Sequence, residues 1–222
     1  MGILWLTGST GALASAIRAK YLAEGWSAAG FSRSGDGFTH ERYRTYHADL
    51  TNEDSVQQSF ATAMADTGAP TALIATVGGV RPWKLTRDTK IEDFRALLEL
   101  NLVSFFLAAK HGMSQMTGGG SIISIGAEPA LEPSAKKGGY VAAKAGVIAL
   151  TRVLAEEGKS SGITANCIVP TIIRTEANEE WGSLGEIPKW TKPEDIAAMC
   201  YFLTSEAGKA VNGATIRMPG KM

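Results

Sequence analysis

Short apolar runs alternate along this chain with longer segments of helical periodicity, and this alternation limits the folds that the chain can adopt. The run GILWL, for example, precedes GALASAIRAKYLAEG, in which apolar residues recur at helical spacing. Strands that alternate with helices build parallel sheets covered by helices on both faces. We therefore predict an α/β fold, a single domain over residues 1–222 with one doubly wound parallel sheet of about seven strands.

The same pattern places the individual elements. Strands are expected at residues 2–6, 26–32, 43–50, 71–79, 118–126, 162–170 and 213–220, and helices at 11–25, 52–68, 88–116, 138–158 and 192–206. Gly25 is expected to end the first helix, Asn52 to cap the second, and Pro193 to lie near the first turn of the last. Pro170 is expected to stop the sixth strand.

The charge balance bears on the partners of the chain. Its 22 basic residues equal its 22 acidic residues, and no basic run occurs, so neither nucleic acid nor an anionic membrane is expected as a partner. A small-molecule substrate is expected instead. The N-terminus has the pattern of a strand, without a charged leader, a cleavage site or an apolar run of membrane-spanning length, and this pattern predicts a cytoplasmic protein.

The cysteines and histidines give no metal-ligand spacing. Cys167 and Cys200 fall in apolar segments far apart in sequence, which predicts buried free thiols. His40, His47 and His111 are likewise scattered, so no metal site is predicted.

The stretch TGSTGALA, residues 7–14, directly follows the first apolar run. Gly8 and Gly11 would let backbone N–H groups approach a pyrophosphate at the positive end of the first helix. Ala14 stands where such loops carry a third glycine and adds only one methyl group. The alternative is an ordinary tight turn between strand and helix.

Tyr140 and Lys144 lie four residues apart on a predicted helix and therefore share one face. A free phenol has a pKa near 10, so acid or base work near neutrality needs a shift of about 3 units, or about 4 kcal/mol. A neighbouring ammonium stabilises the phenolate and moves the pKa in that direction. The alternative is a surface Tyr and Lys on an amphipathic helix.

Several motifs occur in one order along the chain: TGSTGALA, Asp49 after the third strand, TVGG after the fourth, NLVSFF, and YVAAK. This set, together with the ending KPEDIAAMCYFLTSEAGKAVNGATIRMPG, resembles the short-chain dehydrogenase/reductase family over essentially the whole chain. The resemblance implies a Rossmann-like fold and a nicotinamide cofactor. It also implies hydride transfer between the nicotinamide and a small carbonyl or conjugated substrate.

The resemblance also implies roles for individual residues. Tyr140 would be the proton donor or acceptor, Lys144 would hold the nicotinamide ribose and tune the tyrosine, and Asn101 would hold a water in the proton relay. For Asn101 the alternative is a helix-interior side chain bonded to backbone. Besides Tyr140 and Lys144, the implied cofactor contacts are Gly8, Ser9, Thr10, Gly11, Ala12, Leu13, Ser32, Arg33, Ser34, Asp49, Leu50, Val77, Gly78, Gly79, Pro170, Thr171, Ile173 and Thr175. Thr171 replaces the family's glycine.

The end of the second strand bears on the choice of cofactor. An acid there would bond the ribose 2′-hydroxyl of NAD, whereas an arginine accommodates the 2′-phosphate of NADP. Ser32 stands at the acid position and Arg33 follows. Because guanidinium binds phosphate bidentately, NADP(H) is favoured. NAD(H), served by Asp36 or a backbone contact, is the alternative.

One position departs from the family pattern where the substrate is expected. The family carries a serine thirteen residues before its tyrosine, and here that position is Ala127. Losing one preorganised donor to an oxyanion typically costs about 2.7 to 4 kcal/mol. A conjugated, quinonoid substrate that spreads its charge needs this donor less. Glu128 or Ser134 could supply a substitute polar contact to a carbonyl substrate.

Within the family, IGAEPALEPSAKKGGYVAAKAGV and IVPTIIRTEANE look most like the dihydropteridine reductase branch, which also lacks the serine. That resemblance implies a pteridine-like substrate. Trp83, Trp181 and Trp190 could form a slot for an aromatic substrate, or could anchor loops or a subunit contact.

The helices around Asn101 and Tyr140 are apolar on more than one face, which predicts a homodimer or homotetramer, although a buried helix of a monomer looks similar. Two rival functions remain at this point: a cofactor-binding sensor that has lost turnover, and an isomerase or dehydratase that retains its cofactor.

Overall fold

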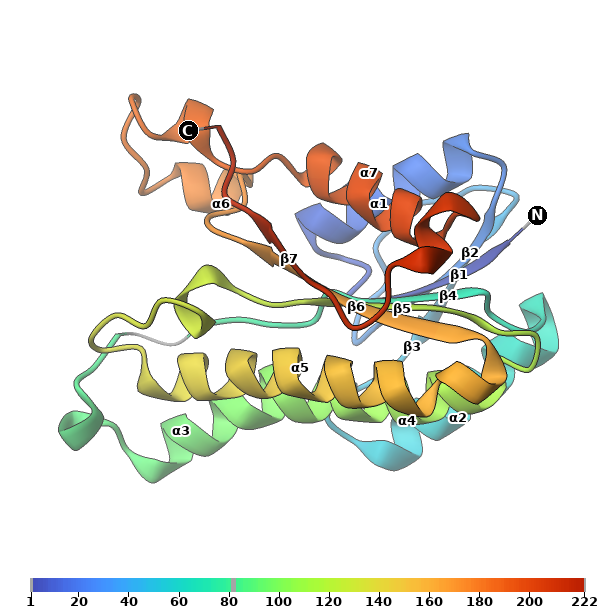
Figure 1. Ribbon diagram of the computed structural model, residues 1–222, viewed down its shortest axis with the longest axis horizontal. Coiled ribbons are helices and arrows are strands. Elements are labelled where there is room, and N and C mark those ends of the chain that lie inside the picture. Colours follow the sequence, from blue (N-terminus) through green and yellow to red (C-terminus); the bar gives the residue numbers. More distant parts are fainter. Residues whose placement is uncertain (1, 81–82, 222) are drawn as a thin grey trace.

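The computed structural model describes residues 2–80 and 83–221 (Figure 1). Within these residues, seven parallel strands form one sheet in the order β3-β2-β1-β4-β5-β6-β7. The strands are β1 Ile3–Thr7, β2 Ser27–Ser32, β3 Tyr43–His47, β4 Ala72–Ala75, β5 Gly120–Ile125, β6 Ile163–Pro170 and β7 Thr215–Met218. The predicted α/β fold with a parallel sheet of about seven strands is therefore confirmed.

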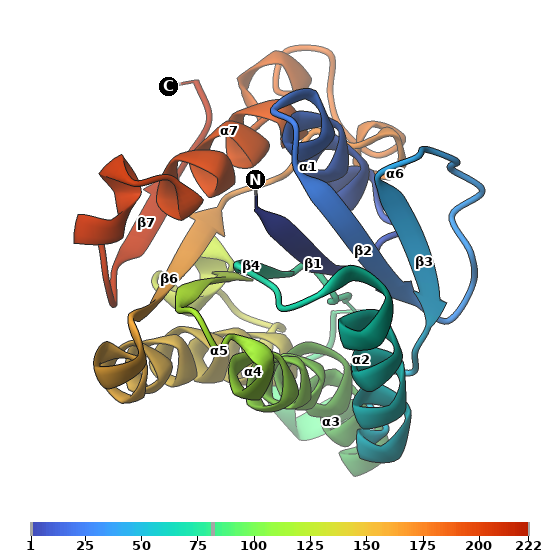
Figure 2. The same cartoon turned by 90° about the vertical axis from the view of Figure 1, so that its right-hand side faces the viewer.

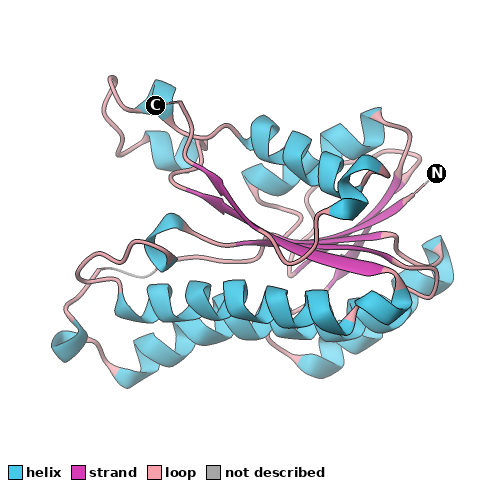
Figure 3. Ribbon diagram, viewed as in Figure 1, coloured by secondary structure: helices cyan, strands magenta, loops and turns pink. Residues whose placement is uncertain are grey.

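Helices cover both faces of the sheet, as Figures 1 and 3 show. One face carries α1 (Ala12–Ala23) and α7 (Pro193–Thr204), and the other carries α2 (Glu53–Thr67), α4 (Ser104–Gln115) and α5 (Gly138–Glu157). Helix α3 (Ile91–Leu98) leads into α4, and the short α6 (Glu176–Glu179) follows β6. Each face buries its own apolar cluster, because strands covered on both sides present apolar side chains to both.

The expected helix at 88–116 is not continuous. Between α3 and α4 the segment Glu99–Val103 is π-helical, so that the N–H of Ser104 bonds the carbonyl of Glu99 five residues earlier. Such single-turn widenings are rare and frequently mark functional sites. Asn101 lies inside this segment and is buried.

The expected termini of other elements are confirmed. The side chain of Asn52 accepts a hydrogen bond of 2.9 Å from the N–H of Ser55 and caps α2. Gly25 has a φ of +83°, a conformation that glycine adopts without strain, directly after α1. Pro193 begins α7, and β6 ends at Pro170.

Helix α5 is the longest helix in the described part of the chain. With 20 residues and a mean hydropathy of 1.2, it is long and apolar enough to cross a membrane by composition alone, yet Val147, Ile148 and Leu154 are buried in the core beneath the sheet. Val153 on α5 and Phe106 on α4 are exposed. The homodimer or homotetramer expected through these helices stays a prediction. Cys167 and Cys200 are buried free thiols, as predicted.

The strand order reverses between β1 and β4, so the connections that leave their carboxyl ends run to opposite faces of the sheet (Figure 2). Open α/β sheets bind ligands in the crevice that this divergence creates. The loops after β1 and β4 are TGSTGALA and TVGG, the two glycine-containing motifs of the sequence.

Candidate active site

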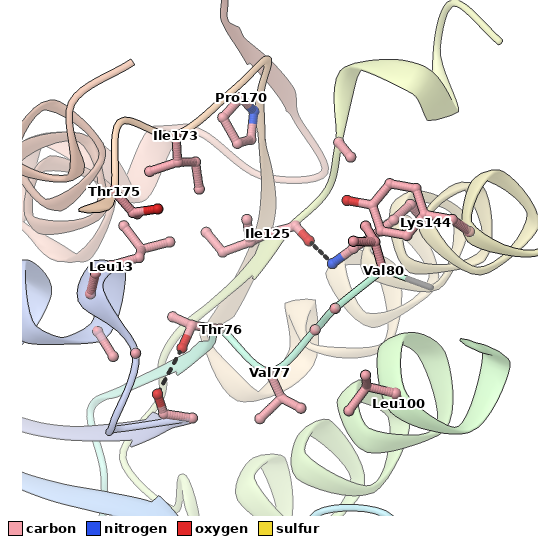
Figure 4. A pocket seen from close by; sticks show the side chains of 18 of the residues that line it. Leu13, Thr76, Val77, Val80, Leu100, Ile125, Lys144, Pro170, Ile173 and Thr175 are labelled. Carbon is pink, nitrogen blue, oxygen red and sulfur yellow. Dashed lines mark hydrogen bonds between the residues drawn. The ribbon is translucent and has the colours of Figure 1, made fainter. Parts of the chain in front are cut away.

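A cavity of about 1060 Å³ opens at this carboxyl edge of the sheet (Figure 4). It runs over the ends of six strands and is lined by residues 8, 10–14, 32–34, 48–51, 76–80, 125–127, 129, 170–173 and 175, with Trp83, Leu100, Lys137, Tyr140, Lys144, Asn178 and Trp181. Of the predicted cofactor residues, all but Ser9 line it. Of the predicted catalytic residues, Tyr140 and Lys144 line it and Asn101 does not.

The turn after β1 has the geometry of an anion site. Gly8 has a φ of +72°, and a Cβ there would lie 2.9 Å from Oγ1 of Thr76, so a larger residue would both strain the backbone and clash. Gly11 caps α1 without any side-chain hydrogen bond, and the first helical bond runs from Ser15 N–H to its carbonyl. The first-turn amides of α1 therefore meet the cavity without a side-chain cap, and the positive helix end fits a pyrophosphate.

Thr76 makes a structural hydrogen bond at the centre of the site. It begins the TVGG loop, and its Oγ1 donates to the carbonyl of Thr7 at 2.7 Å (Figure 4). This bond ties the ends of β1 and β4 together at the reversal point. A side-chain hydrogen bond thus connects the two central strands where they end.

The end of the cavity beyond β2 and β3 carries both expected charged groups. Arg33 is exposed and lines the cavity, and so does Asp49, whose carboxylate accepts bonds from the Thr51 hydroxyl at 2.7 Å and amide at 3.0 Å. These bonds hold the pKa of the Asp49 carboxyl below its usual value. The hydroxyl of Ser32, by contrast, is buried and donates to the carbonyl of Ser34.

Ser9 does not line the cavity, contrary to the expectation from the sequence. Its side chain is fully buried under the turn and donates to the Ser32 hydroxyl at 3.2 Å. The hydroxyl holds the loop after β1 against the end of β2 and has no free face for a ligand.

Asp36, the alternative partner for an NAD ribose, is turned toward α1. Its carboxylate lies 2.5 Å from the Arg18 guanidinium and also accepts from the Tyr43 hydroxyl, and its side chain is only 4% exposed. Phe38 packs over the same guanidinium at 4.0 Å. Asp36 therefore does not line the cavity, and among the described residues of the β2–β3 connection, Arg33 is the charged group that does.

Tyr140 and Lys144 lie one turn apart near the start of α5, on the face that meets the cavity. The Lys144 ammonium donates to the carbonyl of Ile125 at 2.8 Å, which Figure 4 shows. Burial lowers the pKa of Lys144 to about 8 and raises the pKa of Tyr140 to about 12. In the cofactor-free protein burial penalises both charged forms, and the ammonium is bonded to a carbonyl. The expected lowering of the phenol pKa by Lys144 together with a bound nicotinamide stays a prediction.

The Asn101 side chain is fully used by backbone. Its Oδ1 accepts from the Gly79 N–H at 3.1 Å, and its Nδ2 donates to the carbonyls of Gly79 and Leu97 at 2.9 and 3.0 Å. A Cβ at Gly78 would lie 2.9 Å from Oδ1 and 3.1 Å from Nζ of Lys144. The Asn101 side chain is thus bonded to backbone, as the alternative reading of the sequence has it. These bonds hold the TVGG loop in place next to Lys144. The water-holding role stays a prediction.

The other end of the cavity carries aromatic groups. Trp83 and Trp181 line it, and the Trp83 ring stands edge-on to Tyr140 with centroids 5.8 Å apart. Trp190 does not join a slot, since it is buried and packs against Trp181 at 5.1 Å. Ala127 lines the cavity, 5% exposed.

Neither suggested substitute for the missing serine lines the cavity. Glu128 is bound by Arg217 of β7, which also contacts Glu132 at 2.8 Å, and Ser134 is exposed. Lys137, Pro129 and Asn178 line the cavity without having been predicted. Lys137 precedes Tyr140 by three residues, so the helical spacing that paired Tyr140 with Lys144 could also have found it.

Comparisons with known proteins agree with this geometry. Residues 36–220 match the family model described as enoyl-(acyl carrier protein) reductase. A short-chain type dehydrogenase/reductase of Picea abies is 32% identical over 200 residues, which cover 84% of this chain and 72% of the relative. An NAD-dependent glycerol dehydrogenase of Listeria innocua is 33% identical over 159 residues, 67% of this chain and 63% of the relative. The solved structure of a blue fluorescent protein from a metagenomic library, in complex with NADPH, superposes with a TM-score of 0.86 at 25% identity, covering 99% of this chain and 96% of that one.

Proposed function

Because this chain belongs to the short-chain dehydrogenase/reductase family and is an NAD(P)-dependent oxidoreductase, we propose that it uses NADPH to reduce a small conjugated substrate of the quinonoid or pteridine-like kind. One observation carries the proposal: Ala127 lines the cavity at the end of β5, beside Gly126 and Pro129. None of these three side chains can donate a hydrogen bond. A localised alkoxide would lack the donor that a preorganised site supplies, whereas a conjugated system spreads the developing charge.

The chain's own residues fit the implied cofactor. The uncapped start of α1 suits the pyrophosphate, Arg33 and Ser34 suit the adenosine end, and Lys144 lies beside Tyr140 for the ribose. The nicotinamide, when bound, supplies or accepts the hydride. Tyr140 keeps its proton at neutral pH, since burial raises its pKa to about 12 in the cofactor-free protein. It lines the cavity as the proton source for a substrate that becomes more basic as it accepts the hydride.

A substrate panel tests the proposal. Oxidation of NADPH and of NADH is followed with purified protein against a quinonoid dihydropterin, a simple quinone and a set of small ketones. We expect turnover of the conjugated substrates and little of the ketones. Tight binding of both cofactors without reduction of any substrate would contradict the proposal and favour the cofactor-binding sensor.

Introducing the missing hydroxyl should change this selectivity. Ala127→Ser is expected to raise kcat/KM for ketones, relative to a quinone, by about ten- to a thousandfold, because a hydroxyl donor then faces the reacting oxygen. Ala130→Ser is the matched control, since Ala130 lies on the same loop and does not line the cavity. Equal ratios in wild type and Ala127→Ser would show that the position has no influence on the reacting oxygen.

The preference for NADP(H) rests on Arg33. One relative is named as NAD-dependent and one solved structure holds NADPH, so the choice for this chain depends on its own residues. Arg33→Ala is expected to raise KM for NADPH about tenfold or more relative to KM for NADH, because a charge-assisted bidentate contact to phosphate is lost. Arg44→Ala, an exposed arginine of β3 outside the cavity, is the control in the same steady-state assay. An unchanged ratio in Arg33→Ala would contradict this assignment.

A further inference from the structure

The charges that line the cavity are unevenly distributed. Arg33 and Asp49 belong to the end beyond β2 and β3, and Lys144 is bonded to the main chain beside Tyr140. At the end that holds the aromatic groups, Lys137 is the charged lining residue among the described part of the chain. The lining of this end therefore contains the Lys137 ammonium and no carboxylate from the described residues.

Lys137 is held beside the reacting centre. It is the residue directly before α5, one turn ahead of Tyr140, and its ammonium lies 5.2 Å from the centroid of the Trp83 ring. The same ring stands edge-on to Tyr140. An ammonium, an aromatic ring and the phenol thus occupy one short stretch of cavity wall.

The position opposite this ammonium is open for a ligand. Within residues 2–80 and 83–221, no carboxylate lies within ion-pair distance of Lys137, whereas its neighbour Lys84 is paired with Asp93 at 3.2 Å. The aromatic ring attracts the cation but leaves its other donors unused, since an ammonium has three. A carboxylate or phosphate is the group that satisfies such donors best.

We propose that the substrate carries an anionic group, a carboxylate or a phosphate, which Lys137 binds while the planar part of the substrate packs against Trp83. This inference rests on the proposed reductase function and specifies its substrate class. Lys137 is then a specificity-determining residue, because it fixes the distance between the anionic group and the atom that receives the proton from Tyr140.

Matched substrates of one shape test the inference. The probes are (1,4-benzoquinon-2-yl)acetate, its methyl ester and (1,4-benzoquinon-2-yl)methyltrimethylammonium, which place a negative, neutral or positive group at the same position of one quinone ring. We expect wild type to favour the carboxylate. Lys137→Met should lower the ratio of kcat/KM for the carboxylate to that for the ester about ten- to a hundredfold, as for a lost charge-assisted hydrogen bond. Lys137→Glu should reverse the preference toward the cation.

Lys136→Met is the matched control, because it removes the same charge one residue earlier and Lys136 does not line this cavity. It should leave the carboxylate-to-ester ratio unchanged. A calorimetric titration of terephthalate into the cofactor complex gives a readout that is independent of turnover, and Lys137→Met should weaken this binding by a similar factor.

The outcomes separate the two proposals. If no quinonoid substrate is reduced with either cofactor, the proposed function fails. If substrates are reduced but the carboxylate-to-ester ratio and terephthalate binding are the same in wild type and Lys137→Met, the inference fails and the function stands. An equal effect of Lys136→Met would also overturn the inference, because it would show that any positive charge on this surface attracts the carboxylate.

Discussion

Tyr140→Phe is expected to lower kcat by about a hundred- to ten-thousandfold, the usual contribution of a positioned general acid. The phenol is partly buried and meets the cavity beside Lys144, and the variant removes only its hydroxyl. Binding of NADPH, measured by fluorescence titration, should remain close to that of wild type, because the pyrophosphate and adenosine ends of the cavity are untouched.

The matched control for this variant is Tyr46→Phe. Tyr46 lies on β3 and its hydroxyl bonds Asp66 at 3.1 Å, outside the cavity. The Tyr46→Phe variant should reduce substrate at the wild-type rate. Full activity of Tyr140→Phe would rule out the phenol as proton donor, whereas loss of both activity and NADPH binding would indicate a structural defect.

Lys144→Met is expected to change the pH dependence of stability in the cofactor-free protein. Burial lowers the pKa of Lys144 from 10.5 in the unfolded chain to about 8 in the folded one. Between these values the unfolded chain binds more protons, so this group makes the free energy of unfolding rise with pH. Below pH 8 both states are protonated, and the folded state bears the cost of a buried ammonium.

The measurement is the difference in unfolding free energy between wild type and Lys144→Met, from urea titrations at pH 7 to 10.5. Both proteins share every other titrating group, including Tyr140 and the two cysteines. The difference therefore reports Lys144 together with its coupling to Cys167, whose pKa the Lys144 charge lowers. Relative to the variant, wild type should gain about 1.4 kcal/mol per pH unit above pH 8, and on the order of 3 kcal/mol in all. A difference independent of pH would show that the ammonium is not desolvated. Turnover by Lys144→Met should fall as well, since the ribose contact is removed.

The sheet, most of its helices and the edge at which the cavity opens were predictable from sequence. Alternating apolar runs define a parallel sheet, and the loops after parallel strands meet at one edge. Gly8 and Gly11 could therefore be placed beside Arg33 and Tyr140 without coordinates. The same reasoning failed for Ser9, because the sequence does not show which way a small polar side chain turns within a tight loop.

Asn101 and Lys144 show a second limit. The family resemblance pointed to Asn101, and helical spacing paired Lys144 with Tyr140. Their partners are the backbone of Gly79, in the loop after β4, and of Ile125, at the end of β5. Hydrogen bonds to distant backbone carry no sequence pattern. The pKa values of Lys144 and Tyr140 in the cofactor-free protein were not predictable for the same reason, since burial and the bond to Ile125 determine them.

The π-helical segment also affects how the sequence between residues 88 and 116 should be interpreted. Each residue of an α-helix advances about 100° around the axis, so one additional residue within a turn shifts the phase of everything after it. The apolar stripe of α3 and that of α4 consequently belong to two separate periodicities, although the chain between them is unbroken. A deletion of one residue in this segment would bring both apolar stripes into a single helical periodicity, and it would remove the widened turn that holds Asn101 against Gly79 of the loop after β4.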